Sequence, residues 1–123
     1  MGRAEQLDQR TVMMFVSSEQ FMLQARQAER LTVQQEKELF AQMQAGDDQA
    51  AQRLAQSYLP TVAATAQRVS PGGKPSLELI CRFVAVLEQE VKTFDFSQDR
   101  EHFSHRLRLA LKKAITAYIA DQP

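Results

Sequence analysis

The sequence is poor in the residues that build cross-links, sharp turns and aromatic sites. Of its 123 residues, one is cysteine, four are glycine, four are proline, two are histidine and none is tryptophan. A single cysteine excludes a disulfide framework and any zinc site built from several cysteines. So few glycines and prolines leave little material for the turns of a many-stranded β protein. These absences favour a helical fold.

Long apolar runs and a net charge are also absent. No stretch approaches the roughly 18 consecutive apolar residues of a membrane-spanning helix. The N-terminus shows no basic segment, apolar run and cleavage site in sequence, so nothing marks it for export. Fifteen basic and fifteen acidic side chains cancel, and the isoelectric point is near 6.7. We therefore expect a soluble, cytoplasmic protein that makes no membrane contact, with a length that suits one domain.

The abundant residues agree with helices. Alanine, glutamine and leucine are the most frequent residues, and all three are good helix formers. Apolar residues recur at intervals of three and four along most of the chain. We predict an all-α fold, a compact helical bundle.

Capping residues predict where the first clear helices begin and end. Thr32 lies three residues before Gln35, the spacing of a capping box. Ala45-Gly46 predicts the end of that helix, because glycine commonly terminates helices. Asp47 or Asp48 then caps the next helix.

Breaking residues divide the rest of the chain. Pro60 limits the helix before it, although proline is tolerated in the first turn of a new helix. The segment Ser70-Pro71-Gly72-Gly73-Lys74-Pro75 predicts a loop, and Ser76 caps the helix that follows. The predicted helices after Pro60 cover about 62–69, 76–91 and 100–119.

The first 30 residues predict one or two further helices. A second capping box is expected at Ser17-Ser18-Glu19-Gln20. The large apolar side chains of this segment predict packing on the main bundle, with a partner's groove as the alternative. They are Met13, Met14, Phe15 and Phe21.

Charge is unevenly distributed along the neutral chain. Residues 1–50 hold five basic and eight acidic groups, residues 51–99 hold five of each, and residues 100–123 hold five basic and two acidic groups. The basic last helix fits phosphate contact on one face. It equally fits a solvated surface whose cations suit the helix dipole.

No catalytic or metal-binding signature emerges. His102 and His105 are three residues apart, and Glu101 lies four residues before His105, but no third or fourth metal ligand stands nearby. Cys81 lies among apolar residues, where a buried packing role is expected. Pro71-Gly72-Gly73-Lys74 lacks the further glycine and the hydroxyl residue of a phosphate-binding loop. We expect neither enzymatic activity nor a metal or cofactor.

The stretch from Leu31 to Leu59 resembles the opening of the second, promoter-recognition domain of bacterial RNA polymerase sigma factors. That family shows leucine-threonine, a glutamate-rich helix, alanine-glycine-aspartate, and then an alanine/leucine helix. The matching residues here are Leu31-Thr32, Glu36 and Glu38, Ala45-Gly46-Asp47, and Ala51 with Leu54.

The resemblance extends to about residue 119. Later matches are Leu59, Val62, Ala66 and Arg68, then Gly73 and Pro75, then Leu79-Ile80, Leu87, Val91 and Phe94-Asp95, and finally Phe103-Ser104, Arg108, Ala114 and Ile115. It implies a sigma-like helical domain at residues 31–123, preceded by an N-terminal helical extension at residues 1–30.

The resemblance places a partner-binding face on the helix after the loop. In the family this helix reads leucine-isoleucine-glutamine-glutamate-glycine-asparagine and binds a coiled coil of the polymerase's largest subunit. The corresponding residues here are Leu79-Ile80-Cys81-Arg82-Phe83-Val84. Arg82 reverses the charge of the family's acid, and only Glu78 keeps acidic character. The implied partner-binding residues are Glu78, Cys81, Arg82, Phe83 and Val84, and the reversed charge predicts an altered contact with the polymerase.

The resemblance also implies a nucleic-acid face on the last helix. Where the family carries a tyrosine and paired tryptophans, this chain has Arg106, Leu109 and Ala110. Unstacked bases need aromatic faces, so base capture is not expected. We expect Phe103 to lie in the core. The cations that remain for phosphate contact are Arg106, Arg108, Lys112 and Lys113.

Two functions therefore stay open. The first is a diverged sigma-factor-like transcription protein that binds promoter DNA, the RNA polymerase core, or both, in transcription initiation or its regulation. The second is a helical interaction module that binds another protein, or a second copy of itself. It would use the apolar N-terminal segment or the patch Arg82-Phe83-Val84.

Overall fold

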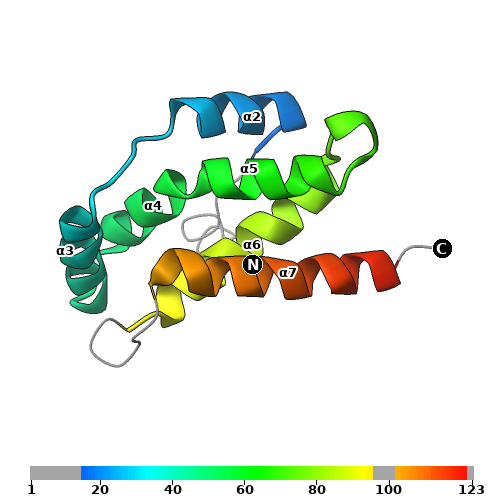
Figure 1. The fold of residues 1–123 in the computed structure, drawn as a ribbon. Coiled ribbons are helices and arrows are strands. Elements are labelled where there is room, and N and C mark those ends of the chain that lie inside the picture. The colour runs from blue at the N-terminus through cyan, green and yellow to red at the C-terminus, as the bar shows by residue number, and fades with distance from the viewer. Residues whose placement is uncertain (1–14, 96–101, 122–123) are drawn as a thin grey trace, which may run out of the picture.

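A computed structural model describes residues 15–95 and 102–121, and Figure 1 shows their arrangement. These residues form the helices α2 (Ser18–Gln27), α3 (Val33–Gln44), α4 (Asp48–Ser57), α5 (Leu59–Arg68), α6 (Leu77–Thr93) and α7 (Phe103–Ala120), with a short 3-10 helix, η1 (Pro71–Gly73). The described part of the chain contains no β-strand, which confirms the predicted all-α fold.

The capping box predicted for α3 is present. The Thr32 hydroxyl accepts a hydrogen bond from the Gln35 backbone N–H at 3.1 Å, and the Gln35 side-chain oxygen accepts one from the Thr32 N–H at 2.9 Å. Gly46 follows the helix with a φ of 106°, a left-handed conformation that favours glycine. Both predicted ends of this helix are therefore confirmed.

The helices α4 and α5 follow each other with a single residue, Tyr58, between them. Asp47 caps α4, and its carboxylate accepts hydrogen bonds from the N–H groups of Gln49 and Ala50. Tyr58 ends α4 and directly precedes α5, where Pro60 occupies the first turn. The tolerated first-turn proline is thus confirmed, because Pro60 has no N–H to leave unpaired there.

Capping also sets the starts of the last two helices. The Ser76 hydroxyl accepts a hydrogen bond from the Leu79 N–H at 3.2 Å, as the sequence predicts. The cap of α7 is His102, whose Nδ1 accepts a bond from the Ser104 N–H. The predicted start near Arg100 is therefore too early, and Arg100 itself lies outside the described residues.

The helix α2 belongs to the same core as the rest of the bundle. It packs on α5 and α6, and it buries Phe21 and Ala25. Phe15 meets Phe21 edge-on, with ring centroids 5.1 Å apart. The predicted packing of this segment is confirmed for Phe15 and Phe21, whereas Met13 and Met14 lie outside the described residues.

The predicted second capping box is present only in part. The Ser17 hydroxyl accepts a hydrogen bond from the Gln20 N–H at 3.0 Å, so Ser17 caps α2. The Gln20 side-chain oxygen accepts instead from the Val16 N–H at 2.7 Å, one residue before the cap.

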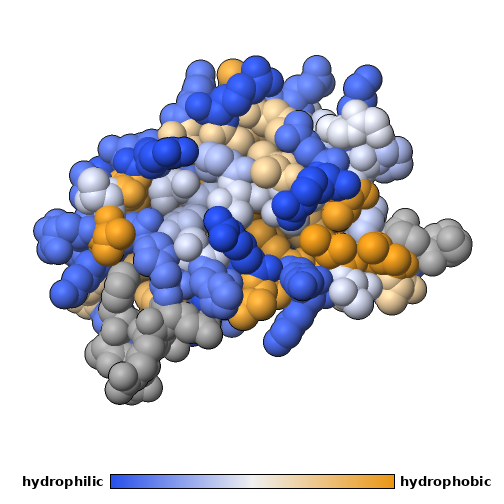
Figure 2. All heavy atoms as spheres, viewed as in Figure 1, coloured by the Kyte–Doolittle hydropathy of each residue, from blue (hydrophilic) through white to orange (hydrophobic). Residues whose placement is uncertain are grey.

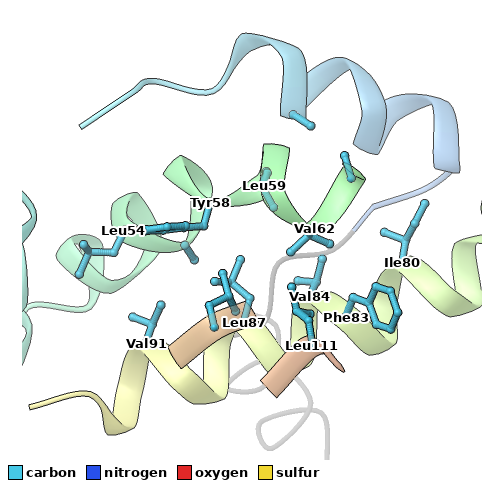
Figure 3. Close-up of a cluster of buried hydrophobic side chains, with 14 of the residues drawn as sticks. Leu54, Tyr58, Leu59, Val62, Ile80, Phe83, Val84, Leu87, Val91 and Leu111 are labelled. Carbon is cyan, nitrogen blue, oxygen red and sulfur yellow. The ribbon is translucent and has the colours of Figure 1, made fainter. Parts of the chain in front are cut away.

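The core forms where α4, α5, α6 and α7 face one another. α5 lies between α2 and the pair of α6 and α7 (Figure 1). Apolar side chains from these helices point into one cluster (Figure 3), which includes Leu54, Leu59, Val62, Ile80, Phe83, Val84, Leu87, Val91 and Leu111. Each large apolar side chain buried in this way contributes about 1.5–3 kcal/mol to folding.

Four aromatic rings close one end of the core. Phe103 contacts Tyr58, Phe94 and Phe40 of α3, and Phe40 also contacts Phe94, with ring centroids 4.9–5.4 Å apart. Phe103 is 1% exposed, so its expected place in the core is confirmed. The cluster ties α3, the α4–α5 junction and the end of α6 to the first residue of α7.

Candidate nucleic-acid and partner interface

The helix α7 turns one face inward and presents a basic face to solvent. Phe103, Leu107 and Leu111 are buried on the inner face. The four basic residues expected to meet phosphates are the only charged residues in α7, which contains no acid. Figure 2 shows hydrophilic and hydrophobic side chains intermixed over the face of the molecule that carries α7.

Helical spacing divides these four cations between two flanks. Arg108 and Lys112 are four residues apart and form the Tyr58 flank, named for the nearby tyrosine whose ionisation Arg108 influences. Arg106 and Lys113 are seven residues apart and border α6, beside Leu109, and we term this side the α6 flank. Arg108, Lys112 and Lys113 are exposed, and none forms an ion pair with a described residue.

Arg106 differs from the other three because its charge is already paired. Its Nε donates to Glu90 Oε1 of α6 at 2.8 Å, and both side chains are mostly buried, at 30% and 21% exposed. A terminal nitrogen donates to the Thr93 hydroxyl at 3.4 Å, and the guanidinium lies 5.8 Å from the centre of the Phe94 ring. Arg106 therefore holds α7 against α6, and its capacity to neutralise a phosphate is reduced.

Three of the predicted partner-binding residues lie on the outer surface of α6. Glu78, Cys81 and Arg82 are exposed near the start of the helix. Arg82 pairs with Asp121 at 3.2 Å and lies 5.4 Å from the centre of the Tyr118 ring. The two charged side chains are 43% and 61% exposed, so this pair contributes little to stability.

The predicted contact role of Phe83 and Val84 is wrong. Phe83 is 0% exposed and Val84 is 1% exposed, and Figure 3 shows both within the core. They follow Ile80 by three and four residues, so they share its inward face. The patch Arg82-Phe83-Val84 consequently offers only Arg82 to a partner.

The expectation for Cys81 is also wrong in one respect. Its apolar neighbours predicted a buried thiol, but the residue is exposed. Cys81 lies at the edge of the stripe formed by Ile80, Val84 and Leu87, and one step of 100° carries its side chain out of the core.

A buried polar pair that the sequence analysis missed lies between α3 and the α4–α5 junction. The Tyr58 hydroxyl donates a hydrogen bond to Glu36 Oε2 at 2.8 Å, and both residues are buried. Burial first, and then the hydrogen bond to Glu36 and its negative charge, raise the pKa of Tyr58, whereas the charge of Arg108 lowers it. Glu36 precedes Leu39 and Phe40 by three and four residues, so its place on the inward face is the signal that could have found it.

A groove runs beside this pair, between α2, the non-helical linker at residues 28–32, and α5. Its volume is about 700 Å³, and Glu36 and Tyr58 line it. Other lining residues are Arg26, Glu29, Arg30, Leu31 and Ala63. Glu29 is paired with Arg53 at 3.1 Å on the surface.

The possible metal ligands, among them the two histidines, and a possible membrane-spanning helix are the remaining features considered in the sequence. Within residues 15–95 and 102–121, no group of three or more histidine, cysteine, aspartate or glutamate side chains is placed to hold a metal ion. His102 serves as the cap of α7, and His105 is exposed. The helices of this described part are all too short or too polar to cross a membrane.

Comparison with known proteins leaves the family open. No family model matches the chain, and no solved structure gives a significant match to its fold.

Proposed function

We propose that the chain is a sigma-factor-like transcription protein whose α7 helix binds the phosphate backbone of DNA. The observation that supports this is the charge of α7: four basic residues and no acidic residue, with three of the cations exposed. Such a helix attracts phosphates without reading bases directly. The chain has no tryptophan that could provide a stacking surface for bases, so the proposal is limited to phosphate contact.

The DNA contact is tested by the salt dependence of binding. Three phosphate contacts predict that the logarithm of affinity for duplex DNA falls against the logarithm of salt with a slope of about −2.7. Lys112→Ala should reduce that slope by about 1 and weaken binding equally for unrelated sequences. Lys74→Ala, which removes one exposed cation from the loop before α6, is the matched control and should change nothing. Absence of binding at low salt would overturn the proposal.

The start of α6 is the proposed site for the polymerase. Glu78, Cys81 and Arg82 are accessible there, and Arg82 has the charge opposite to that of the family's residue. We suggest a pull-down of core RNA polymerase with the tagged chain, alongside Arg82→Glu. Retention of polymerase by the natural chain would indicate a working sigma-type factor. Retention by the variant alone would indicate that the original partner has been abandoned.

One observation favours the alternative of a protein-interaction module. Val16 is 83% exposed and Leu23 is 51% exposed, both in the N-terminal segment that this alternative uses. Single exposed apolar residues are common, but two near one helix fit a contact surface. If neither chain retains polymerase and self-association at rising concentration is abolished by Leu23→Glu, this function replaces the first. Phe83→Glu is unsuitable for this test, because Phe83 is in the core.

A further inference from the structure

Glu36 is a buried carboxylate with one oxygen that has no partner among the described residues. The residue is 7% exposed. Its Oε2 accepts the Tyr58 hydroxyl, whereas its Oε1 exposes less than 1 Å² and accepts no hydrogen bond. Buried polar atoms are nearly always hydrogen-bonded, because an unpaired one loses its water without replacement. An oxygen in this position calls for a donor that the described residues do not supply.

The missing donor is not available from the neighbouring hydroxyl. Tyr58 carries one hydroxyl hydrogen, and it already donates this hydrogen to Oε2. Since no other described residue donates to Oε1 either, a bound molecule or water is the candidate donor.

The groove beside Glu36 has the size of a small-molecule site. Its volume of about 700 Å³ falls within the range of roughly 300–1,000 Å³ that is typical of ligand pockets. Alanine and methionine side chains of α2 and α5 provide apolar walls. Glu36 belongs to α3 and Tyr58 ends α4, and both line the groove. We term it the Glu36 groove.

The Glu36 groove also carries positive charge. Arg26 of α2 and Arg30 of the linker line it, and both are exposed without an ion-pair partner among the described residues. The fourth charged lining residue, Glu29, is paired with Arg53. The groove thus combines a buried acceptor on α3 with free guanidinium groups on α2 and the linker.

We propose that the Glu36 groove binds a small zwitterion, with a primary ammonium or guanidinium group on Glu36 and a carboxylate on Arg26 or Arg30, joined by an aliphatic stem. A cationic donor satisfies Oε1 through a charge-assisted hydrogen bond. A guanidinium group binds a carboxylate with two parallel hydrogen bonds. Because Oε1 exposes less than 1 Å², binding requires the side chains that cover it to move aside.

The test compares three probes of one length on the full chain. They are 6-aminohexanoate, which carries both charges, n-hexylamine, which carries the cation alone, and hexanoate, which carries the anion alone. Titration at millimolar concentrations is followed by backbone-amide NMR shifts. We expect 6-aminohexanoate to bind most tightly, hexylamine more weakly and hexanoate least, with shifts centred on Glu36, Tyr58 and Ala63. Equal binding of hexanoate, or no binding of either amine, would overturn the proposal and leave water as the partner of Oε1.

A variant of Glu36 and a matched control test where the cationic group of the ligand binds. Glu36→Gln keeps the shape of the side chain but removes its charge, so we expect the affinity for both amines to fall by about tenfold or more. Glu38→Gln, at an exposed carboxylate on the same helix, is the matched control and should not change it. Thermal melting by circular dichroism establishes that each variant is folded.

Arg30→Gln keeps the test decisive if Glu36→Gln does not fold. Arg30→Gln changes an exposed residue and should remove the preference for 6-aminohexanoate over hexylamine. An unchanged preference in both Arg30→Gln and Arg26→Gln would contradict the proposed carboxylate site. These outcomes are independent of DNA binding, which is measured on α7.

Discussion

Arg106 and Arg108 lie two residues apart on α7 and have the same charge, but their surroundings differ. Arg106 is mostly buried, bound to Glu90, and placed over the Phe94 ring. Arg108 is exposed on the opposite flank and forms no ion pair with a described residue. The first arginine serves the fold and the second is free to meet a ligand. A count of basic residues along a helix therefore overstates the charge that the helix offers to nucleic acid.

The largest expected effect separates the two arginines by stability. Arg106→Ala removes a mostly buried ion pair and should lower the free energy of unfolding by about 1–2 kcal/mol, allowing for partial exposure. Arg108→Ala should change it by less than about 0.5 kcal/mol. Urea denaturation of both variants measures the difference. Equal losses would mean that the contact with Glu90 contributes nothing.

The second effect concerns the core beside the Tyr58 flank. The pKa of Tyr58 is raised in the folded protein, so its neutral form is favoured there. Stability is then fully present below about pH 10, where unfolded tyrosine begins to ionise, and it falls by up to about 1.4 kcal/mol per pH unit above that value. Urea denaturation at about pH 9 and about pH 11 should show this loss. Tyr58→Phe should lose less stability over this pH range. If the variant loses as much as the natural chain, groups other than Tyr58 cause the loss.

The third effect concerns DNA binding, where we expect Arg108 to matter more than Arg106, the opposite of their order in stability. Arg108→Ala should weaken DNA binding several-fold and reduce the slope of its salt dependence by about 1, because one exposed cation is lost. Arg106→Ala should leave the slope nearly unchanged at temperatures where it is folded, since Glu90 already holds that charge. Fluorescence anisotropy with a labelled duplex measures both. A larger effect of Arg106→Ala on the slope would show that phosphate displaces Glu90.

The smallest effect is expected at Arg82. Its bond to Asp121 is 3.2 Å long, but the two side chains are far more exposed than those of Arg106 and Glu90. Arg82→Ala should therefore change the free energy of unfolding by no more than about 0.5 kcal/mol. A loss as large as that of Arg106→Ala would mean that exposure does not distinguish the two pairs.

Local features of the fold were predictable from the sequence because their determinants are close together along the chain. The capping box of Thr32 and Gln35, the cap at Ser76 and the first-turn proline at Pro60 involve neighbouring residues only. The inward stripe of α6 likewise follows from apolar residues spaced three and four apart, Ile80, Val84, Leu87 and Val91. The apolar neighbours of Cys81 predicted a buried thiol, but the residue lies one helical step outside the stripe and is exposed.

Features that depend on packing between helices were not predictable. Glu90 lies 16 residues before Arg106, and nothing in the sequence pairs them. The bond between Tyr58 and Glu36 spans 22 residues and requires α3 and the α4–α5 junction to be in place. Phe83 and Val84 were assigned to a surface from the resemblance, although their spacing from Ile80 already favoured the core. Where the resemblance and the apolar periodicity disagreed, the periodicity was the better guide to burial.

The aromatic cluster has a consequence for the order in which the protein folds. Phe94 and Phe103 are near each other in the chain but distant from Phe40 and Tyr58, whereas α3 and α4 are neighbours that pack on each other directly. Bringing distant residues together requires the closure of long loops, which is entropically costly and slow. Because α6 and α7 are also neighbours that pack directly, we expect the α3–α4 and α6–α7 pairs to form early and the aromatic cluster to form later, when the two pairs meet. The helix proposed to meet DNA would then reach its final position only in that later step.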